Sequence, residues 1–388
     1  MKIELSIPSP ALLPAGFRDV LPPEAEAEAA LVEGLMQVFG SHGYERVAPP
    51  MLEFEESLLA GAGAAIAEQM FRLMDSDTHR MMGLRADITP QIGRIATSRL
   101  VHVARPLRLS YAGLCLRTRA VAPELARQVA QAGVELIGPD LPEADAEIVL
   151  VAAEALRGAQ VPGLSFDLTM PALVPAMLDE AGIVGVARQA LLHGLDRKDV
   201  ADVAEYGGVL AGVLTDLLLA AGDADQAIAA LARVDFSPEA ARLAQRLTDS
   251  ARAVQARDPG LKLTVDPVEF RGFRYHTGVS VTAYAVGSAE ELGRGGRYLS
   301  GPNAEPATGI TLFPEAVARV APRGARKPRL FVPLGIAGAP ALRVAGFATV
   351  AQLAAADDLE AEARRLLCSH ILRNGVAVAL PVLQTENK

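Results

Sequence analysis

Residues 114–138 read LCLRTRAVAPELARQVAQAGVELIG, and they predict two strands separated by a proline-containing turn. In the second strand, polar or small residues alternate with apolar ones over 131–136. Successive side chains of a strand point to opposite faces, so one face is apolar and the other carries Gln131 and Glu135 with Gly133 between them. At a rise of roughly 3.3 Å per residue, those two polar groups lie about 13 Å apart.

This polar face has two interpretations. The glycine leaves room for a small ligand between two polar end groups. Alternatively, the polar residues face solvent on a half-exposed antiparallel strand, which is common. The preceding strand shows the same pattern on the face that carries Gly113, Cys115, Arg117 and Arg119. The pattern alone leaves both interpretations open.

The remaining segments predict an α+β fold, with an antiparallel sheet flanked by helices. Helical spacing is expected over 24–39, after Pro90 and over 145–156. Residues 171–257 are rich in alanine and leucine and predict an inserted helical segment, which divides a core of 1–170 and 258–322. Residues 323–388 predict a small C-terminal α/β domain.

Two local predictions concern the second half of the chain. GRGGRYLSG (293–301) is interpreted as a glycine-rich turn. Residues 348–375 are expected to form one or two helices between the strands 329–334 and 376–383.

The proline pair in RVAPPML (46–52) predicts an interrupted strand at a sheet edge.

Composition excludes several classes of protein. The chain has 388 residues, a net charge of −9 and two cysteines too far apart in sequence for a zinc motif. No long uncharged apolar run or signal-peptide pattern occurs, so we expect a cytoplasmic protein without a membrane partner. The one compact basic run, 323–329, is interpreted as a solvated linker. Phosphate-loop, dinucleotide, zinc-protease and serine-hydrolase motifs are absent, and no metal site is expected.

Five motifs in order resemble the class II aminoacyl-tRNA synthetases, specifically histidyl-tRNA synthetase, over roughly residues 10–320. GYERVAPPMLE (43–53) resembles the first class motif and GLRADIT (83–89) resembles LRPEGT. LCLRTR followed by ARQVAQAGVE resembles FRxE followed by RQFxQxGxE. RGFRYHTG (271–278) resembles RGLDYYTG, and GRGGRYLSG resembles AGGRYDGL.

The resemblance implies a histidine-binding site. Carried over position by position, the site comprises Asp87, Thr89, Arg117, Gln131, Glu135, Arg271, Tyr275, His276 and Tyr298. Asp87, Thr89 and Gln131 would receive the ammonium group, and Glu135 the imidazole N–H. Arg271, together with Arg117, would pair with the carboxylate. Asp87 is one methylene shorter than the family's glutamate, and His276 replaces a tyrosine.

The chain departs from the synthetases where they handle ATP and tRNA. Arg119 stands in place of the glutamate expected to contact adenosine. ATGITLFPEA (307–316) has Ala316 in place of the arginine that grips the ATP phosphates. The C-terminal segment is too short for a full anticodon-binding domain, and the net charge is acidic.

A family that keeps the amino-acid site and lacks the ATP chemistry is that of the ATP phosphoribosyltransferase regulatory subunits, which this chain resembles. The resemblance implies no catalytic residue and no cofactor. It implies a short-form catalytic ATP phosphoribosyltransferase chain as partner, L-histidine as effector, no tRNA, and a homodimer within a hetero-oligomer. Two alternatives stay open: a degenerate synthetase that still activates an amino acid, and a scaffold with a vestigial pocket.

Overall fold

The computed structural model describes residues 12–60, 63, 67–121, 126–270, 276–301, 303–322, 326–336 and 339–381. The chain divides into two compact units, Met1–Pro322 and Arg323–Lys388. Among the helices of the described residues, none is both long and apolar enough to cross a membrane.

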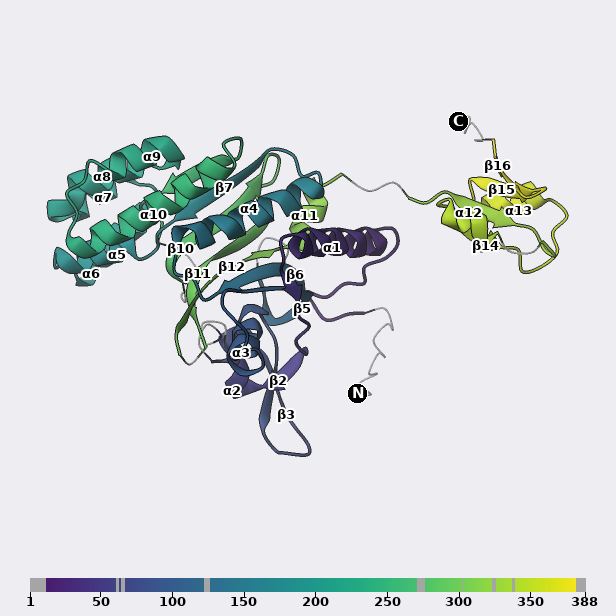
Figure 1. The fold of residues 1–388 in the computed structure, drawn as a ribbon, viewed down its shortest axis with the longest axis horizontal. Helices are drawn as coiled ribbons and strands as arrows, with labels where there is room; N and C mark the ends of the chain where they lie inside the picture. Colours follow the sequence, from purple (N-terminus) through teal and green to yellow (C-terminus); the bar gives the residue numbers. More distant parts are fainter. Residues whose placement is uncertain are drawn as a thin grey trace, which may run out of the picture. The chain divides into compact units, whose positions relative to one another are not determined.

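A nine-stranded sheet organises the first unit (Figure 1). In spatial order its strands are β1 (Glu45–Arg46), β5 (Leu107–Val121), β6 (Ala126–Ile137), β12 (Glu305–Leu312), β11 (Gly293–Ser300), β10 (His276–Ala285), β7 (Leu164–Thr169), β9 (Lys262–Asp266) and β8 (Gly222–Asp223). All neighbours from β5 to β7 pair antiparallel, whereas β1 and β9 add to them in parallel. The predicted antiparallel sheet flanked by helices is confirmed.

Helices cover the two faces of this sheet. One face carries α1 (Glu24–Ser41), α4 (Pro142–Gly158), α10 (Pro238–Arg257) and α11 (Pro314–Val320), and the other carries α3 (Thr89–Ser98). Ala132, Val134 and Leu136 of β6 are buried in the large core beneath the first group. Because side chains alternate, Gln131 and Glu135 point to the α3 face.

A small three-stranded sheet lies beside α3. It is formed by β2 (Leu52–Phe54), β4 (Met81–Leu84) and β3 (Phe71–Met74), and α2 (Glu55–Leu58) follows β2. The interrupted strand expected around Pro49 and Pro50 is therefore two short strands, and each lies at the edge of its own sheet. This placement fits the missing N–H of proline, which cannot pair within a sheet.

Six helices occupy the segment between β7 and β9. They are α5 (Leu173–Glu180), α6 (Gly185–Asp196), α7 (Val200–Tyr206), α8 (Ala211–Ala220), α9 (Ala224–Leu231) and α10, with the short helix η2 (Gly208–Leu210) between α7 and α8. Asp199, Asp223 and Ser237 cap α7, α9 and α10 by accepting backbone N–H groups with their side chains. In Figure 1, α10 lies alongside α4 over the sheet.

The glycine-rich segment 293–301 is not the predicted turn, because β11 is a central strand of the sheet. A Cβ added to Gly295 would lie 2.0 Å from the carbonyl oxygen of Gly309 on β12. The glycines therefore allow close approach of neighbouring backbones. Sequence reasoning mistook this packing requirement for a turn signal.

The second unit contains a four-stranded sheet of its own. Its strands, in spatial order, are β14 (Ala348–Ala351), β13 (Arg329–Val332), β15 (His370–Arg373) and β16 (Val376–Ala379), and its helices are α12 (Pro340–Val344) and α13 (Leu359–Arg365). The helical prediction for 348–375 is wrong at both ends, since β14 and β15 pair in parallel with β13. Burial of Ile371 and partial burial of Val350 around Phe331 override the alanine-rich composition between them.

Candidate functional site

The polar face of β6 is buried. Gln131 is 2% exposed and Glu135 is 1% exposed. The solvent-exposed interpretation of this strand is therefore wrong. Buried side chains of this kind require hydrogen-bond partners, and the neighbouring elements supply them.

Three hydroxyl groups converge on the Glu135 carboxylate. Thr89, at the start of α3, donates to Oε1 at 2.9 Å, and Tyr111 of β5 donates to the same oxygen at 3.3 Å. Tyr298 of β11 donates to Oε2 at 2.9 Å. The hydroxyl oxygens of Tyr111 and Thr311 lie 2.8 Å apart, so the network extends to β12.

Burial raises the pKa of Glu135 to about 8, because the charged form loses its hydration. The hydrogen bonds from Tyr298 and Thr89 oppose this shift, since they stabilise the carboxylate. The group therefore titrates in the neutral range, where a ligand that brings a donor or a positive charge changes its ionisation.

Two glycines leave space for this carboxylate and for its neighbours. A Cβ on Gly309 of β12 would lie 1.9 Å from Glu135 Oε2. A Cβ on Gly133 would lie 2.6 Å from the hydroxyl oxygen of Tyr111, the residue paired with it on β5. Both positions thus require glycine for the cluster to form.

A second part of the cluster is organised by the start of α3. Asp87 Oδ1 accepts the backbone N–H of Thr89 at 2.9 Å. Gln131 Oε1 accepts the backbone N–H of Ile88 at 3.0 Å and is 3.2 Å from the thiol of Cys115. Burial raises the pKa of Asp87, while the positive charge of Arg117 partly offsets this effect.

The arginines near the polar residues are placed differently from one another. Arg117 Nε lies 3.5 Å from the carbonyl oxygen of Ala86, and the side chain is half-buried. Arg119 is exposed. Arg127 stacks over the rings of Phe17 and Phe71, and its Nε donates to the carbonyl of Arg117 at 3.1 Å.

His276 lies on β10 opposite Tyr298 of β11 in the strand register. Its Nδ1 is 2.7 Å from the hydroxyl of Ser280. Burial, assisted by the positive charge of Arg294, lowers the pKa of His276 to about 3 and keeps the ring neutral. Arg271 and Tyr275, which were also predicted, fall outside the described residues.

We call Asp87, Thr89, Gln131, Glu135 and Tyr298 the polar cluster. The structure brings these five predicted residues together on the α3 face, with Arg117 beside Asp87 and His276 opposite Tyr298. Sequence reasoning missed Tyr111 and Thr311. Tyr111 could have been found, because it lies two residues before Gly113 and therefore shares its strand face. The place of Thr311 beside Tyr111 follows from the pairing of β12 with β6, and the sequence does not reveal this pairing.

The position expected to carry the arginine that binds the ATP phosphates holds an alanine in this chain. Ala316, on α11, is 4% exposed, and the following Val317 is fully buried. The preceding Glu315 accepts the backbone N–H of Ala130 at 2.7 Å. A buried alanine and a glutamate engaged with the backbone supply no cation for a triphosphate.

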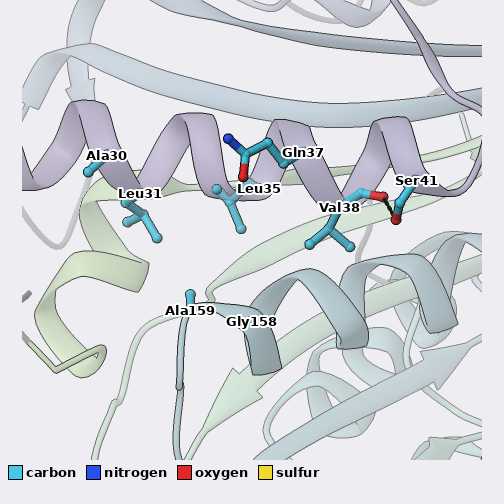
Figure 2. Close-up of a pocket in the computed structure, with 9 residues that line it drawn as sticks. Ala30, Leu31, Leu35, Gln37, Val38, Ser41, Gly158 and Ala159 are labelled. Carbon is cyan, nitrogen blue, oxygen red and sulfur yellow. Dashed lines mark hydrogen bonds between the residues drawn. The ribbon is translucent and has the colours of Figure 1, made fainter. Parts of the chain in front are cut away.

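One hollow of the structure lies apart from the polar cluster. A groove of about 430 Å³ runs between α1 and α4 on the opposite face of the sheet, with Leu31, Val38 and Ala159 among its lining residues (Figure 2). Its lining offers no charged group. Among the described residues, no group of His, Cys, Asp and Glu side chains is arranged to hold a metal ion.

The antiparallel sheet with its flanking helices is the fold of class II aminoacyl-tRNA synthetases. A histidyl-tRNA synthetase structure from Nostoc sp. matches with a TM-score of 0.75 at 16% identity, covering 95% of this chain and 91% of that one. A Bacillus halodurans structure described as an ATP phosphoribosyltransferase regulatory subunit/histidyl-tRNA synthetase matches with a TM-score of 0.76 at 23% identity, covering 93% and 97%.

Sequence comparison defines the family more narrowly. The histidyl-tRNA synthetase family model matches residues 16–317. An ATP phosphoribosyltransferase regulatory subunit of Gluconobacter oxydans is 50% identical over 380 residues, which cover 97% of this chain and 99% of the relative. The corresponding protein of Paramagnetospirillum magneticum is 51% identical over 364 residues, 93% and 96% of the two chains. The chain therefore belongs to the family of ATP phosphoribosyltransferase regulatory subunits.

Proposed function

We propose that this chain is the non-catalytic regulatory subunit of an ATP phosphoribosyltransferase and that its polar cluster binds free L-histidine. The observation that carries the proposal is the buried Glu135, which three hydroxyls surround on the sheet face beneath α3. A carboxylate in this position suits recognition of an imidazole N–H. The catalytic partner is a separate short-form chain that joins ATP and phosphoribosyl pyrophosphate in the cytoplasm.

The chemistry of the cluster matches the two ends of histidine. An ammonium group beside Asp87 would add a second positive charge to that of Arg117 and would lower the raised pKa of Asp87. At the other end, the imidazole would replace one or more hydroxyls as the partner of Glu135. Each hydrogen bond to a charged group contributes about 1.5–3 kcal/mol, and a few together support micromolar affinity, or about −8 kcal/mol.

Two positions outside the polar cluster are poorly suited to amino-acid activation. Arg119 is exposed at the position of the adenosine-contacting glutamate, and Ala316 is buried where a phosphate-binding arginine is needed. Loss of one preorganised charge-stabilising group lowers a rate by about 10²–10³. The alternative function, a synthetase with residual activation of histidine, therefore has weaker support than a sensor.

Histidine bound here can inhibit the catalytic chain only through different affinities for two states of the complex. We expect the subunit to form a homodimer within the hetero-oligomer and to have no tRNA or membrane partner. The acidic net charge of −9 supports the absence of a tRNA surface, which requires clustered cations.

The proposal is tested by assaying a purified short-form catalytic chain with and without this subunit over a histidine series. We expect little activity alone, higher activity with the subunit, and loss of that gain as histidine rises. Glu135→Ala should raise the histidine concentration for half inhibition at least about tenfold, the equivalent of one lost charged hydrogen bond. Glu154→Ala, at an exposed position of α4, is the control and should leave this concentration unchanged. Activity that never depends on the subunit would refute the proposal.

A further inference from the structure

Asp145 joins three elements that are distant in sequence. It lies in the first turn of α4, and its side chain is 4% exposed. Its Oδ1 accepts a hydrogen bond from Arg297 Nε of β11 at 2.9 Å. Its other oxygen, Oδ2, accepts Arg246 Nε at 3.0 Å and the hydroxyl of Ser250 at 3.2 Å, both from α10. A buried carboxylate with this many donors fixes the relative positions of β11, α4 and α10.

Arg297 holds its position through backbone contacts as well. Nη1 donates to the carbonyl of Pro139 at 2.9 Å, and Nη2 donates to the carbonyl of Leu141 at 3.2 Å. The next residue along β11 is Tyr298, which reaches Glu135 on the opposite face of the sheet. Two consecutive residues of β11 therefore connect the polar cluster on one face with α10 on the other.

The junction is incompletely packed. A cavity of about 90 Å³ lies among Arg246, Arg297 and Tyr298, with Asp140 and Arg242 also in its lining. Arg246 Nη2 is 3.0 Å from a carboxylate oxygen of Asp140 as well as from Asp145. Since the Asp140 side chain is 62% exposed, Arg246 has a second, solvent-facing partner already in contact, and the cavity leaves its side chain room to shift between the two carboxylates.

We propose that the Asp145–Arg297–Arg246 cluster transmits occupancy of the polar cluster to the helical segment that ends with α10. A ligand that donates a hydrogen bond to the Glu135 carboxylate displaces the Tyr298 hydroxyl from it and shifts β11. Arg297 then moves relative to Asp145, and Arg246 adjusts between Asp145 and Asp140. This inference rests on the proposed histidine site, and it makes α10 and the helices packed against it the element that changes on binding.

Hydrogen exchange of the full chain with and without saturating L-histidine tests the coupling. In the wild type, histidine should slow exchange in peptides from both β11 and α10. In Arg246→Gln, the slowing in β11 should persist, whereas exchange in α10 with and without histidine should agree within about twofold. Arg252→Gln is the matched control, since Arg252 is an exposed arginine of the same helix that does not line this cavity. It should behave as the wild type.

Ser250→Ala provides a second variant, because it removes one donor to Asp145 with almost no change in shape. It should reduce the histidine-dependent slowing in α10 and leave that in β11, and it decides the outcome if Arg246→Gln folds poorly. Slowing in α10 that both variants retain would overturn the coupling, as would slowing confined to β11 in the wild type. If histidine slows exchange in neither element, and calorimetry shows no binding, the proposed histidine site itself fails.

Discussion

The hydroxyl of Tyr298 donates to Glu135 Oε2 at 2.9 Å, although β12 lies between the strands of the two residues. The bond crosses β12 beside Gly309, which is the residue paired with Glu135. A Cβ on Gly309 would lie 1.9 Å from Oε2, so a side chain there would displace the carboxylate. The polar cluster therefore depends on a missing side chain as much as on its polar groups.

Tyr298→Phe should destabilise the fold. Among the described residues, Tyr298 is the one donor to Glu135 Oε2, so the substitution leaves a buried oxygen without its partner. Such a loss costs about 1–3 kcal/mol in free energy of unfolding, which urea titration measures. Tyr206→Phe, at a surface position 37% exposed, should change the free energy little. Equal effects of the two variants would contradict the assigned role of the Tyr298 hydroxyl.

Glu135→Gln should change how stability depends on pH. The ordinary pKa of the carboxyl is 4.5, and in the folded chain it is about 8. Between these values the folded chain keeps a proton that the unfolded chain releases, so rising pH favours unfolding until it passes the folded pKa. Glutamine has no such proton.

The measurement compares the free energy of unfolding of wild type and Glu135→Gln at about pH 5 and about pH 8.5, on either side of most of this window. The variant should gain stability relative to the wild type as pH rises, because contributions from other titrating groups cancel in the difference. A pH-independent difference would show that the folded pKa is not raised.

Gly309→Ala should disrupt the polar cluster and the sheet around it. The added Cβ meets Glu135 and also lies 2.7 Å from the carbonyl oxygen of Val134, which cannot rotate away. A loss of about 3 kcal/mol or more in free energy of unfolding is expected from such overpacking. Gly34→Ala is the control, since nothing lies within 4 Å of a Cβ there in the middle of α1. It should stabilise the fold by about 0.5–1 kcal/mol.

Ala316→Arg should fail to restore synthetase chemistry. Because Ala316 is 4% exposed beside the buried Val317, an arginine there must overfill the packing or move α11. We expect a loss of about 2–4 kcal/mol in stability and no ATP–pyrophosphate exchange. Ala318→Arg, at a half-buried position of the same helix, should cost less. Exchange activity in the Ala316→Arg variant would mean that a single residue separates this chain from a synthetase.

The alternation around Gly133 was sufficient to predict that Gln131 and Glu135 share a face, because the period of a strand is fixed. It did not reveal that the face is buried, since burial depends on α3 covering it. The resemblance added Asp87, Thr89 and Tyr298. The position of Tyr298 near Glu135 depends on the register of strands far apart in sequence, whereas Thr89 reaches Glu135 from the start of α3.

The errors have physical causes as well. Gly295 and Gly296 have the composition of a turn, but in the fold they permit neighbouring strands to approach closely. Ala348–Ala351 has a short, alanine-containing sequence that is ambiguous alone, and parallel pairing with β13 makes it a strand. Local propensity is weak where pairing between distant segments supplies most of the stabilisation.

The most direct test of the account is equilibrium titration of one preparation of the full chain with L-histidine and, separately, with MgATP, followed by ATP–pyrophosphate exchange. The account predicts saturable histidine binding in the micromolar range, about −8 kcal/mol, weakened in Glu135→Ala. It also predicts no saturable ATP binding and no exchange. Tight ATP binding with measurable exchange, or no heat from histidine, would contradict the claim that this fold keeps an amino-acid site and has lost the nucleotide chemistry.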